Sequence, residues 1–327
     1  MRSVVHAVYG EPAEVLGVGE SPLPEPGPGQ ARVRMLLSPI HNHDLWTVRG
    51  QYGYKPTLPA IAGSEAVGVI DALGEGVEGV AIGQRVTTAG ARGAWAEFFV
   101  VPANSLVPVP DAIDDATAAQ LVAMPLSALM LLEMLDVAAG DWIVQNAANG
   151  AVGKALAMLA RARGVHVLNL VRREEGVAEM AGQGIGNTVC TMHEGWKAQA
   201  RDLMGGARPK AAVDSVSGAA SGVLASLLGE GGLLVSFGSM TGEPMQIPSG
   251  ELIFKQITVK GFWGTPASKA LSPQDRRRLM GELLQRAAGG ELQLPVAATH
   301  GFEDIGQAVH DSLVPGRASK GKVLLRP

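Results

Sequence analysis

The segment at residues 145–153, QNAANGAVG, has the composition of a phosphate-binding turn. An apolar stretch precedes it and an alanine-rich stretch follows it, which predicts a strand, a turn and a helix. In such a turn, backbone N–H groups at the positive end of the helix approach a pyrophosphate, and Gly150 and Gly153 leave no Cβ in the way. The form A-x-x-G-x-x-G is less specific than G-x-G-x-x-G, but the flanking elements favour a dinucleotide site over an ordinary turn.

Two arginines follow the next apolar stretch, residues 165–171. A site that prefers NAD commonly has Asp or Glu about 20 residues beyond the glycines, where the carboxylate binds both ribose hydroxyls. Arg172 and Arg173 stand there instead. A guanidinium group binds a 2′-phosphate, whereas a carboxylate repels it. The pair therefore predicts NADPH as the cofactor, and the alternative is two solvated surface arginines.

His41 and His43 form a His-x-His pair. On a strand, both rings would point to the same face and could bind a metal ion. A lone pair without a third ligand more often lines a polar site. The single cysteine, Cys190, excludes an internal disulfide framework and a zinc site made of four cysteines. We therefore expect no bound metal.

Two kinds of structure must position these residues. Up to about residue 118 the chain reads as short strands separated by turns. The strands are expected at 31–40, 66–73, 82–88 and 95–102. Many short strands at this spacing predict a small, partly open β-barrel.

From Asp115 onward the pattern changes. A helix is expected over 116–135, interrupted at Pro125, and apolar strands then alternate with helices. This alternation predicts an α/β domain of the Rossmann type, with a doubly wound parallel sheet. The expected strands are 142–147, 165–171, 187–191, 211–216, 233–239 and 257–263. The predicted division is a barrel domain at 1–118, completed by 265–327, and a Rossmann domain at 119–264.

The composition of the 327 residues narrows the class of protein. Hydrophobic residues make up 46% and charged residues 18%, which excludes an intrinsically disordered chain. A net charge of −4 argues against a nucleic-acid partner. Because the sequence shows no signal-peptide pattern and no apolar stretch long enough for a membrane helix, we expect a cytoplasmic protein without a membrane partner. The strand at 257–263 would form a sheet edge, which predicts a homodimer.

Several segments resemble the medium-chain dehydrogenase/reductase superfamily, and the resemblance spans almost the whole chain. They read GQYGYKPTLPAIAGSE (50–65), QNAANGAVG (145–153), LNLVRRE (168–174), FGSM (237–240) and LIFKQITVKGFW (252–263). These segments are most similar to the branch of 2-enoyl thioester reductases, with the bacterial quinone oxidoreductases next. The resemblance implies a GroES-like catalytic domain, a Rossmann domain and a reduction that uses NADPH.

The zinc alcohol dehydrogenases belong to the same superfamily. They carry a Cys-His-Thr-Asp-like segment, a Gly-His-Glu segment and a later cysteine. The matching stretches here are His41-Asn42-His43-Asp44 and Gly63-Ser64-Glu65, with Met124 near the third position. Two of the three expected ligands are missing, so the resemblance implies a zinc-independent enzyme. Met124 also stands where the enoyl reductases usually have an asparagine.

The resemblance assigns a set of cofactor-binding residues. They are Asn149, Gly150, Ala151, Val152, Arg172, Arg173, Phe237, Gly238, Ser239, Met240, Phe262, Trp263 and Lys322. The first four would contact the phosphates and the ribose, and the two arginines the 2′-phosphate. The segments at 237–240 and 262–263 would lie along the nicotinamide half. A C-terminal lysine contact is assigned to Lys322 rather than Lys320.

Tyr52 matches the tyrosine that acts in the 2-enoyl thioester reductases. In that reaction hydride reaches the β-carbon, negative charge builds on the thioester oxygen, and a proton reaches the α-carbon. A phenol can stabilise this enolate by a hydrogen bond or donate the proton. The resemblance therefore implies an NADPH-dependent reductase of an activated C=C bond, in a 2-enoyl thioester or an enone, with Tyr52 as the catalytic residue. The alternatives are an NADPH:quinone oxidoreductase, a zinc-dependent alcohol dehydrogenase and an NADPH-binding protein with little turnover.

Overall fold

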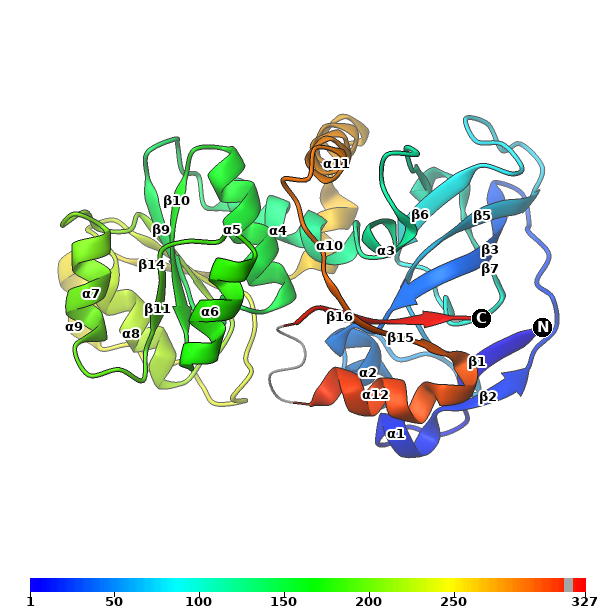
Figure 1. The fold of residues 1–327 in the computed structure, drawn as a ribbon, viewed down its shortest axis with the longest axis horizontal. Helices are drawn as coiled ribbons and strands as arrows, with labels where there is room; N and C mark the ends of the chain where they lie inside the picture. Colours follow the sequence, from blue (N-terminus) through cyan, green and yellow to red (C-terminus); the bar gives the residue numbers. More distant parts are fainter. Residues whose placement is uncertain (315–319) are drawn as a thin grey trace. The chain divides into compact units, whose positions relative to one another are not determined.

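The computed structural model describes residues 1–314 and 320–327, and the chain divides into two compact units (Figure 1). The first unit holds Met1–Met124 and Met280–Pro327, and the second holds Pro125–Leu279. The sequence places the corresponding boundaries at 118/119 and 264/265. In both divisions the first unit is made of two separate pieces of chain.

The first unit contains two sheets. Its strands are β1 (Arg2–His6), β2 (Gly17–Glu20), β3 (Gln30–Pro39), β4 (Ala60–Ile61), β5 (Glu65–Leu73), β6 (Arg85–Ala89), β7 (Phe98–Pro102), β8 (Val107–Pro108), β15 (Val296–Gly301) and β16 (Lys322–Arg326). The larger sheet has the order β15-β16-β3-β5-β6-β8, with β7 paired to β3, and the smaller has the order β2-β1-β4. All these pairs are antiparallel except β15 with β16. This is the partly open barrel of a GroES-like domain.

Short helices connect the strands of the first unit. They are α1 (Pro12–Val15), α2 (Asn42–Val48), α3 (Asp115–Ala118) and α12 (Ile305–Leu313), with 3-10 turns at Ala103–Ser105 and Phe302–Asp304. Two further helices cross a boundary between the units: α4 (Ala123–Met134) and α11 (Pro273–Ala288). The helix expected over 116–135 is thus two helices, and the break precedes Pro125. Pro125 lies in the first turn of α4, where a backbone N–H has no helical partner to lose.

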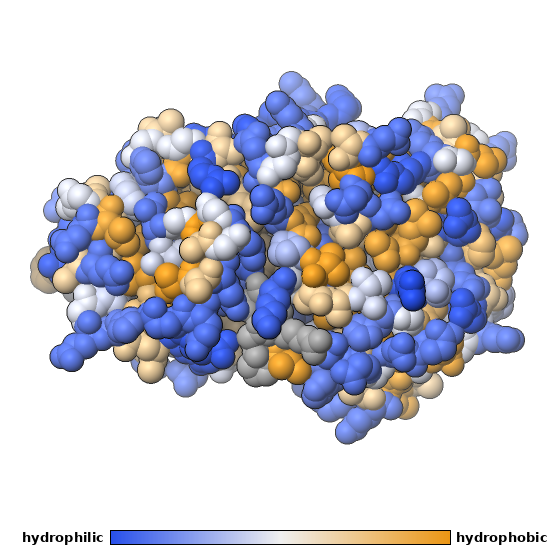
Figure 2. Space-filling view, viewed as in Figure 1, coloured by the Kyte–Doolittle hydropathy of each residue, from blue (hydrophilic) through white to orange (hydrophobic). Residues whose placement is uncertain are grey.

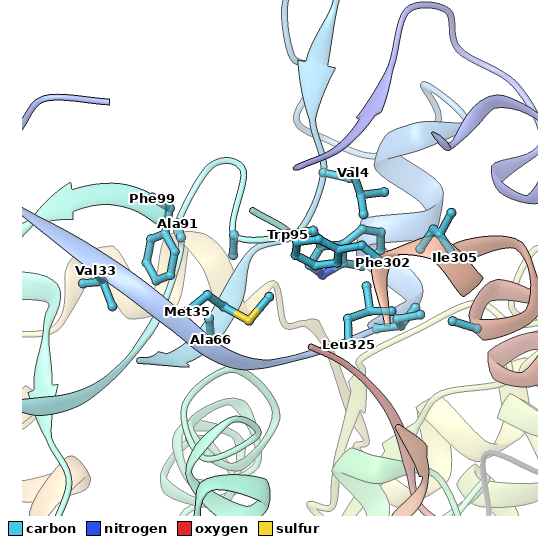
Figure 3. Packing of buried hydrophobic residues seen from close by; sticks show 14 of the residues in the cluster. Val4, Val33, Met35, Ala66, Ala91, Trp95, Phe99, Phe302, Ile305 and Leu325 are labelled. Carbon is cyan, nitrogen blue, oxygen red and sulfur yellow. The ribbon is translucent and has the colours of Figure 1, made fainter. Parts of the chain in front are cut away.

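The core of the first unit joins its two pieces of chain (Figure 3). Trp95 and Met35 come from the N-terminal piece, and Phe302 and Leu325 from the C-terminal piece, and all four are buried. Gly63 has φ +91°, and a Cβ at this position would overlap the Trp95 ring. The C-terminal segment therefore completes the barrel.

The second unit is a Rossmann-type α/β domain. Its strands are β9 (Trp142–Gln145), β10 (His166–Val171), β11 (Thr188–Cys190), β12 (Ala211–Asp214), β13 (Leu233–Ser236) and β14 (Thr258–Gly261). Its helices are α5 (Ala151–Ala162), α6 (Glu174–Gly182), α7 (Trp196–Leu203), α8 (Ala219–Leu227), α9 (Ser249–Lys255) and α10 (Gly264–Ala270). Every strand pair is parallel, in the order β11-β10-β9-β12-β13-β14, and helices cover both faces of the sheet (Figure 1).

The strand order reverses at β9, because the chain moves outward to β10 and β11 and then returns to β12. In doubly wound sheets, ligands bind at the carboxyl ends of the strands beside such a reversal. The expected fold class, a GroES-like barrel with a Rossmann sheet, is confirmed. The core of this unit is aliphatic, with Val144, Leu168 and Leu234 buried on neighbouring strands.

The face drawn in Figure 2 is mainly hydrophilic, with apolar residues in patches between the charged ones. No helix among the described residues combines the length and the apolar character that a membrane span requires. In the second unit, two large apolar side chains of α9 are exposed, Ile253 at 60% and Phe254 at 82%.

Candidate functional site

The glycine turn lies at the carboxyl end of β9, where α5 begins. Four expected cofactor residues lie together here: Asn149, Gly150, Ala151 and Val152. Gly150 is the N-cap of the helix and is exposed, so the helix N-terminus is accessible. A Cβ on Gly153 would come within 2.5 Å of the Ala148 carbonyl oxygen. The turn itself therefore requires this glycine.

Two buried amides, which the sequence analysis does not include among the site residues, fix the turn to the sheet. Gln145 donates from Nε2 to the Gly153 carbonyl at 2.8 Å and to Asn169 Oδ1 at 2.7 Å. Asn169 lies on β10, directly opposite Gln145 on β9, and its Nδ2 donates to the Gly186 carbonyl at 2.9 Å. A signal was present in the sequence, because each amide interrupts an apolar strand and a buried polar group needs partners.

Asp214, at the end of β12, organises the next loop and was also missed. Its fully buried Oδ1 accepts hydrogen bonds from Asn146 Nδ2 at 2.7 Å and from the backbone N–H groups of Val216 and Ser217 at 2.9 Å each. The Ser221 hydroxyl donates to Oδ2 at 2.5 Å. These bonds hold the loop after β12 beside the glycine turn.

The residues expected along the nicotinamide half follow β13 and β14. The loop with Phe237, Gly238, Ser239 and Met240 follows β13 and is bonded to Asp214, whose carbonyl accepts from the N–H groups of Phe237 and Gly238. The rings of Phe237 and Phe262 stack with centroids 5.9 Å apart. Met240 is 75% exposed and Trp263 is 53% exposed. These residues therefore lie at the carboxyl edge of the sheet, and their contact with the nicotinamide stays a prediction.

Arg172 and Arg173 follow β10 at the same edge, and both are exposed. Arg173 is the N-cap of α6, and the Arg172 carbonyl accepts a hydrogen bond from the buried Cys190 thiol at 3.3 Å. The backbone of the pair is thus fixed, while the guanidinium groups reach solvent. This arrangement fits a phosphate that arrives from solution.

In the first unit, His41 and His43 lie at the start of α2 and not on a strand. His41 is the N-cap, and its backbone N–H donates to Asp44 Oδ2 at 3.0 Å. The expectation of a strand was wrong because this capping contact starts a helix directly after β3. The two rings nevertheless stack, with centroids 4.9 Å apart.

The His41 ring pairs with a buried carboxyl group. Its Nε2 lies 2.6 Å from Glu65 Oε2, and Glu65 Oε1 accepts from the N–H groups of Val122 and Ala123 at 2.7 and 2.8 Å. Burial raises the pKa of Glu65 to about 8, although the two backbone bonds oppose the shift. Burial also lowers the pKa of His41 well below its ordinary value. Near neutral pH the pair is therefore largely uncharged.

The His43 ring stacks with both His41 and Tyr52. Its Nε2 forms a hydrogen bond of 2.8 Å with the Ser64 hydroxyl, and its side chain is 25% exposed. The Tyr52 ring stacks on it, with centroids 5.7 Å apart, and is half-buried. The predicted catalytic tyrosine therefore stands next to an imidazole that reaches solvent.

Lys322 begins β16 and lies in the first unit with this cluster. Its ammonium group donates to the Ile40 carbonyl at 3.4 Å. Burial lowers the pKa of Lys322, whereas Asp44 and Glu65 oppose the shift. Its contact with a cofactor remains a prediction.

The donors of this cluster do not fit a zinc site. Glu65 already bonds to His41 Nε2, and Ser64 and Met124 stand where the zinc enzymes have ligands. Within residues 1–314 and 320–327, no group of three or more His, Cys, Asp or Glu side chains could hold a metal ion.

Two family models match this chain. The alcohol dehydrogenase GroES-like domain matches residues 27–111, and the zinc-binding dehydrogenase model matches residues 151–283. The first match falls within the barrel unit, and the second covers most of the Rossmann unit.

Curated relatives cover nearly the whole chain. The mitochondrial enoyl-[acyl-carrier-protein] reductase of Xenopus tropicalis is 32% identical over 323 residues, which is 96% of this chain and 92% of that protein. The Bos taurus protein of the same name is 32% identical over 326 residues, covering 98% of this chain and 87% of that protein.

Solved structures match over the full length. A Bacillus thuringiensis protein has 27% identity and a TM-score of 0.90, covering 100% of this chain and 98% of that chain. A mycobacterial quinone oxidoreductase has 26% identity and a TM-score of 0.87, covering all of both chains. A mycobacterial protein complexed with NADPH gives the same values.

Proposed function

Because the chain belongs to the medium-chain dehydrogenase/reductase superfamily, we propose that it reduces an activated C=C bond, in a 2-enoyl thioester or an enone. At the coarser level it is an NADPH-dependent oxidoreductase. The observation that carries the finer proposal is the 32% identity with an enoyl-[acyl-carrier-protein] reductase over 96% of this chain.

The second unit provides the groups that would hold the cofactor. The exposed N-terminus of α5 suits the pyrophosphate, because glycine leaves its N–H groups accessible. The exposed Arg172 and Arg173 suit the 2′-phosphate, and the stacked Phe237 and Phe262 suit one side of the nicotinamide. Bound there, NADPH supplies the hydride for the β-carbon.

The first unit provides the donor for the developing negative charge. Tyr52 is half-buried and carries a phenol that donates a hydrogen bond to the substrate oxygen as the enolate forms. A donor fixed before the reaction stabilises this charge more than mobile water does. The ring stack with His43 fixes the Tyr52 ring.

A quinone is the second candidate substrate. The similarity to a mycobacterial quinone oxidoreductase, with 26% identity over the full chain, supports it. A quinone would use the same cofactor residues but would not need a proton at a defined carbon atom.

A substrate panel tests the proposal. NADPH oxidation is followed with crotonyl-CoA, longer 2-enoyl thioesters, enones and quinones. The proposal predicts the highest kcat/KM for a 2-enoyl thioester or an enone. Turnover with quinones alone would favour the second candidate, and the absence of turnover with every compound would contradict both.

We also propose that the protein forms a homodimer through β14. This strand is the last of the sheet, and all four of its residues are exposed. The exposed Ile253 and Phe254 of α9 precede it in the chain. The free N–H and C=O groups of an exposed edge strand can pair with a second chain. A cytoplasmic location stays a prediction, since the curated relatives named above are mitochondrial.

A further inference from the structure

Three rings lie in a row in the first unit. The centroids of His41 and His43 are 4.9 Å apart with an interplanar angle of 17°, and those of His43 and Tyr52 are 5.7 Å apart with an angle of 29°. The row begins at the buried Glu65 and ends at the half-buried Tyr52. His43 is therefore the titratable residue that stacks directly on Tyr52, the predicted catalytic residue.

The two histidines of the row differ in access. The His41 side chain is 1% exposed, and its Nε2 is occupied by Glu65. The His43 side chain is 25% exposed, so it can exchange protons with water. Of these two histidines, His43 is the one that can contact a substrate and take up a proton from water afterwards.

The His43 ring is also held in one orientation. Its Nε2 lies 2.8 Å from the Ser64 hydroxyl and 3.6 Å from Asp44 Oδ1. Both contacts use the same nitrogen, which leaves Nδ1 for a ligand.

We propose that His43 donates the proton that reaches the α-carbon, while Tyr52 binds the enolate oxygen. This inference rests on the proposed C=C reduction. In the step, the N–H bond of the imidazolium breaks, the enolate electron pair forms the new C–H bond, and the carbonyl group is restored. Overall NADPH is oxidised, the C=C bond is reduced and one proton is consumed, which the imidazole regains from water.

Several charged or titratable groups surround His43. Asp44 lies on the same helix, and the His41 and Tyr52 rings both stack with the His43 ring. Glu65 bonds to His41, and the charge of Lys322 contributes to the lowered pKa of His41. Glu65 contributes little charge below about pH 8, since burial raises its pKa to about 8.

The first test is the variant His43→Gln. A glutamine amide can keep the hydrogen bond to Ser64, but it cannot transfer a proton. With a 2-enoyl thioester and NADPH in D2O, we expect kcat to fall about 100-fold or more, with the Kd for NADPH unchanged. We also expect the variant to lose the preference for one face of the α-carbon, which NMR of the deuterated product measures. His310→Gln, on the exposed side of α12, is the matched control and should behave as the wild type.

The second test does not depend on turnover. Protein labelled at histidine is titrated by NMR, without NADPH, with the saturated thioester that the reaction would produce. The His43 signal is identified as the one missing from His43→Gln, and we expect it to shift because the ring contacts the ligand. If His43→Gln does not fold, Ser64→Ala replaces it, and there we expect a slower reaction with a weakened preference for one α-face.

The outcomes separate this inference from the proposed function. An active wild type whose His43→Gln variant keeps its rate would overturn the role of His43. A slower variant that still protonates a single α-face would also overturn it, because the acid would then be another group. If the wild type reduces no enoyl thioester or enone, the proposed function fails first, and the inference fails with it.

Discussion

Tyr52 is the residue whose removal tests the chemistry most directly. Tyr52→Phe keeps the ring stack on His43 and removes the phenol. We expect kcat to fall by about 10-fold or more, since a positioned donor to the enolate is lost. The Kd for NADPH should not change, because the residues expected to bind it, apart from Lys322, lie in the second unit.

Tyr54→Phe is the matched control for this substitution. The Tyr54 ring is exposed and lies 4.5 Å from the Arg92 guanidinium, a contact that phenylalanine keeps. Steady-state kinetics should show wild-type values for this variant. Wild-type turnover in Tyr52→Phe would end the catalytic assignment.

Arg172 tests the choice between the two nicotinamide cofactors. A guanidinium bonded to a phosphate contributes about 1.5–3 kcal/mol, so Arg172→Ala should raise the Kd for NADPH roughly 10-fold to 100-fold. The Kd for NADH should stay constant, because NADH lacks the 2′-phosphate. Fluorescence titration measures both values. Arg201→Ala, an exposed arginine of α7, is the control, and equal losses for both cofactors in Arg172→Ala would contradict the assignment.

Some site residues could be predicted from the sequence and others could not. The glycine turn is local, so its pattern is visible within nine residues. Gln145 and Asp214 act through partners 24 and 68 positions away, and only the parallel pairing of β9 with β10 and β12 brings them together. Sequence reasoning lacked that pairing, and it therefore missed both residues.

At the level of elements, Gly153 links the glycine turn to α5. Gly153→Ala places a Cβ within 2.5 Å of a backbone oxygen, and we expect it to lower the free energy of unfolding by about 1–3 kcal/mol. Gly281→Ala, within α11, meets no atom within 4 Å and should raise it by up to about 1 kcal/mol. Urea denaturation measures both changes. Equal stability of the two variants would contradict the requirement for glycine at 153.

Glu65 connects the start of α2 to the start of α4 and makes stability depend on pH. Its pKa rises from 4.5 to about 8 on folding, so within that range the folded protein binds more protons than the unfolded chain. Stability therefore falls as the pH rises through this range. Folding lowers the pKa of His41 from 6.5, so this residue makes stability rise with pH. That contribution no longer changes above about pH 6.5. Between about pH 6.5 and 8, the effect of Glu65 remains, and the lowered pKa of Lys322 acts against it.

Glu65→Gln should flatten this dependence. Wild-type Tm should decrease from pH 6.5 to pH 8, and the variant should show a smaller decrease, because an amide does not titrate. Calorimetry at several pH values measures the difference. Glu78→Gln, at an exposed position, should keep the wild-type slope, and an unchanged slope in Glu65→Gln would contradict the pKa shift.

The order of elements was largely predictable, and the exceptions share a cause. The parallel strands are apolar runs, which are visible in sequence. The region of His41 reads as the end of a strand, but the bond from its N–H to Asp44 starts a helix. The helix expected over 116–135 divides into two because the backbone at Val122 and Ala123 bonds to Glu65, about 57 residues earlier in the chain.

At the scale of the whole molecule, the edge strand β14 determines the expected assembly. Light scattering at micromolar concentration should give the mass of a homodimer. Val259→Lys should give a monomer, because it replaces the one large apolar side chain of β14 and adds a second charge beside Lys260, which opposes strand pairing. Met192→Lys, at another exposed apolar residue of the second unit, should remain dimeric. A wild-type monomer would contradict the proposal.

The arrangement of β16 has a consequence for synthesis on the ribosome. This strand lies between β15 and β3, and its residues are made after every residue of the second unit. All residues of the second unit leave the ribosome earlier, so that unit can fold while translation continues. Until β16 is made, Ser38 and Pro39 of β3 lack their strand partner in the nascent protein, and a chaperone must shield this short edge or the chain must tolerate it.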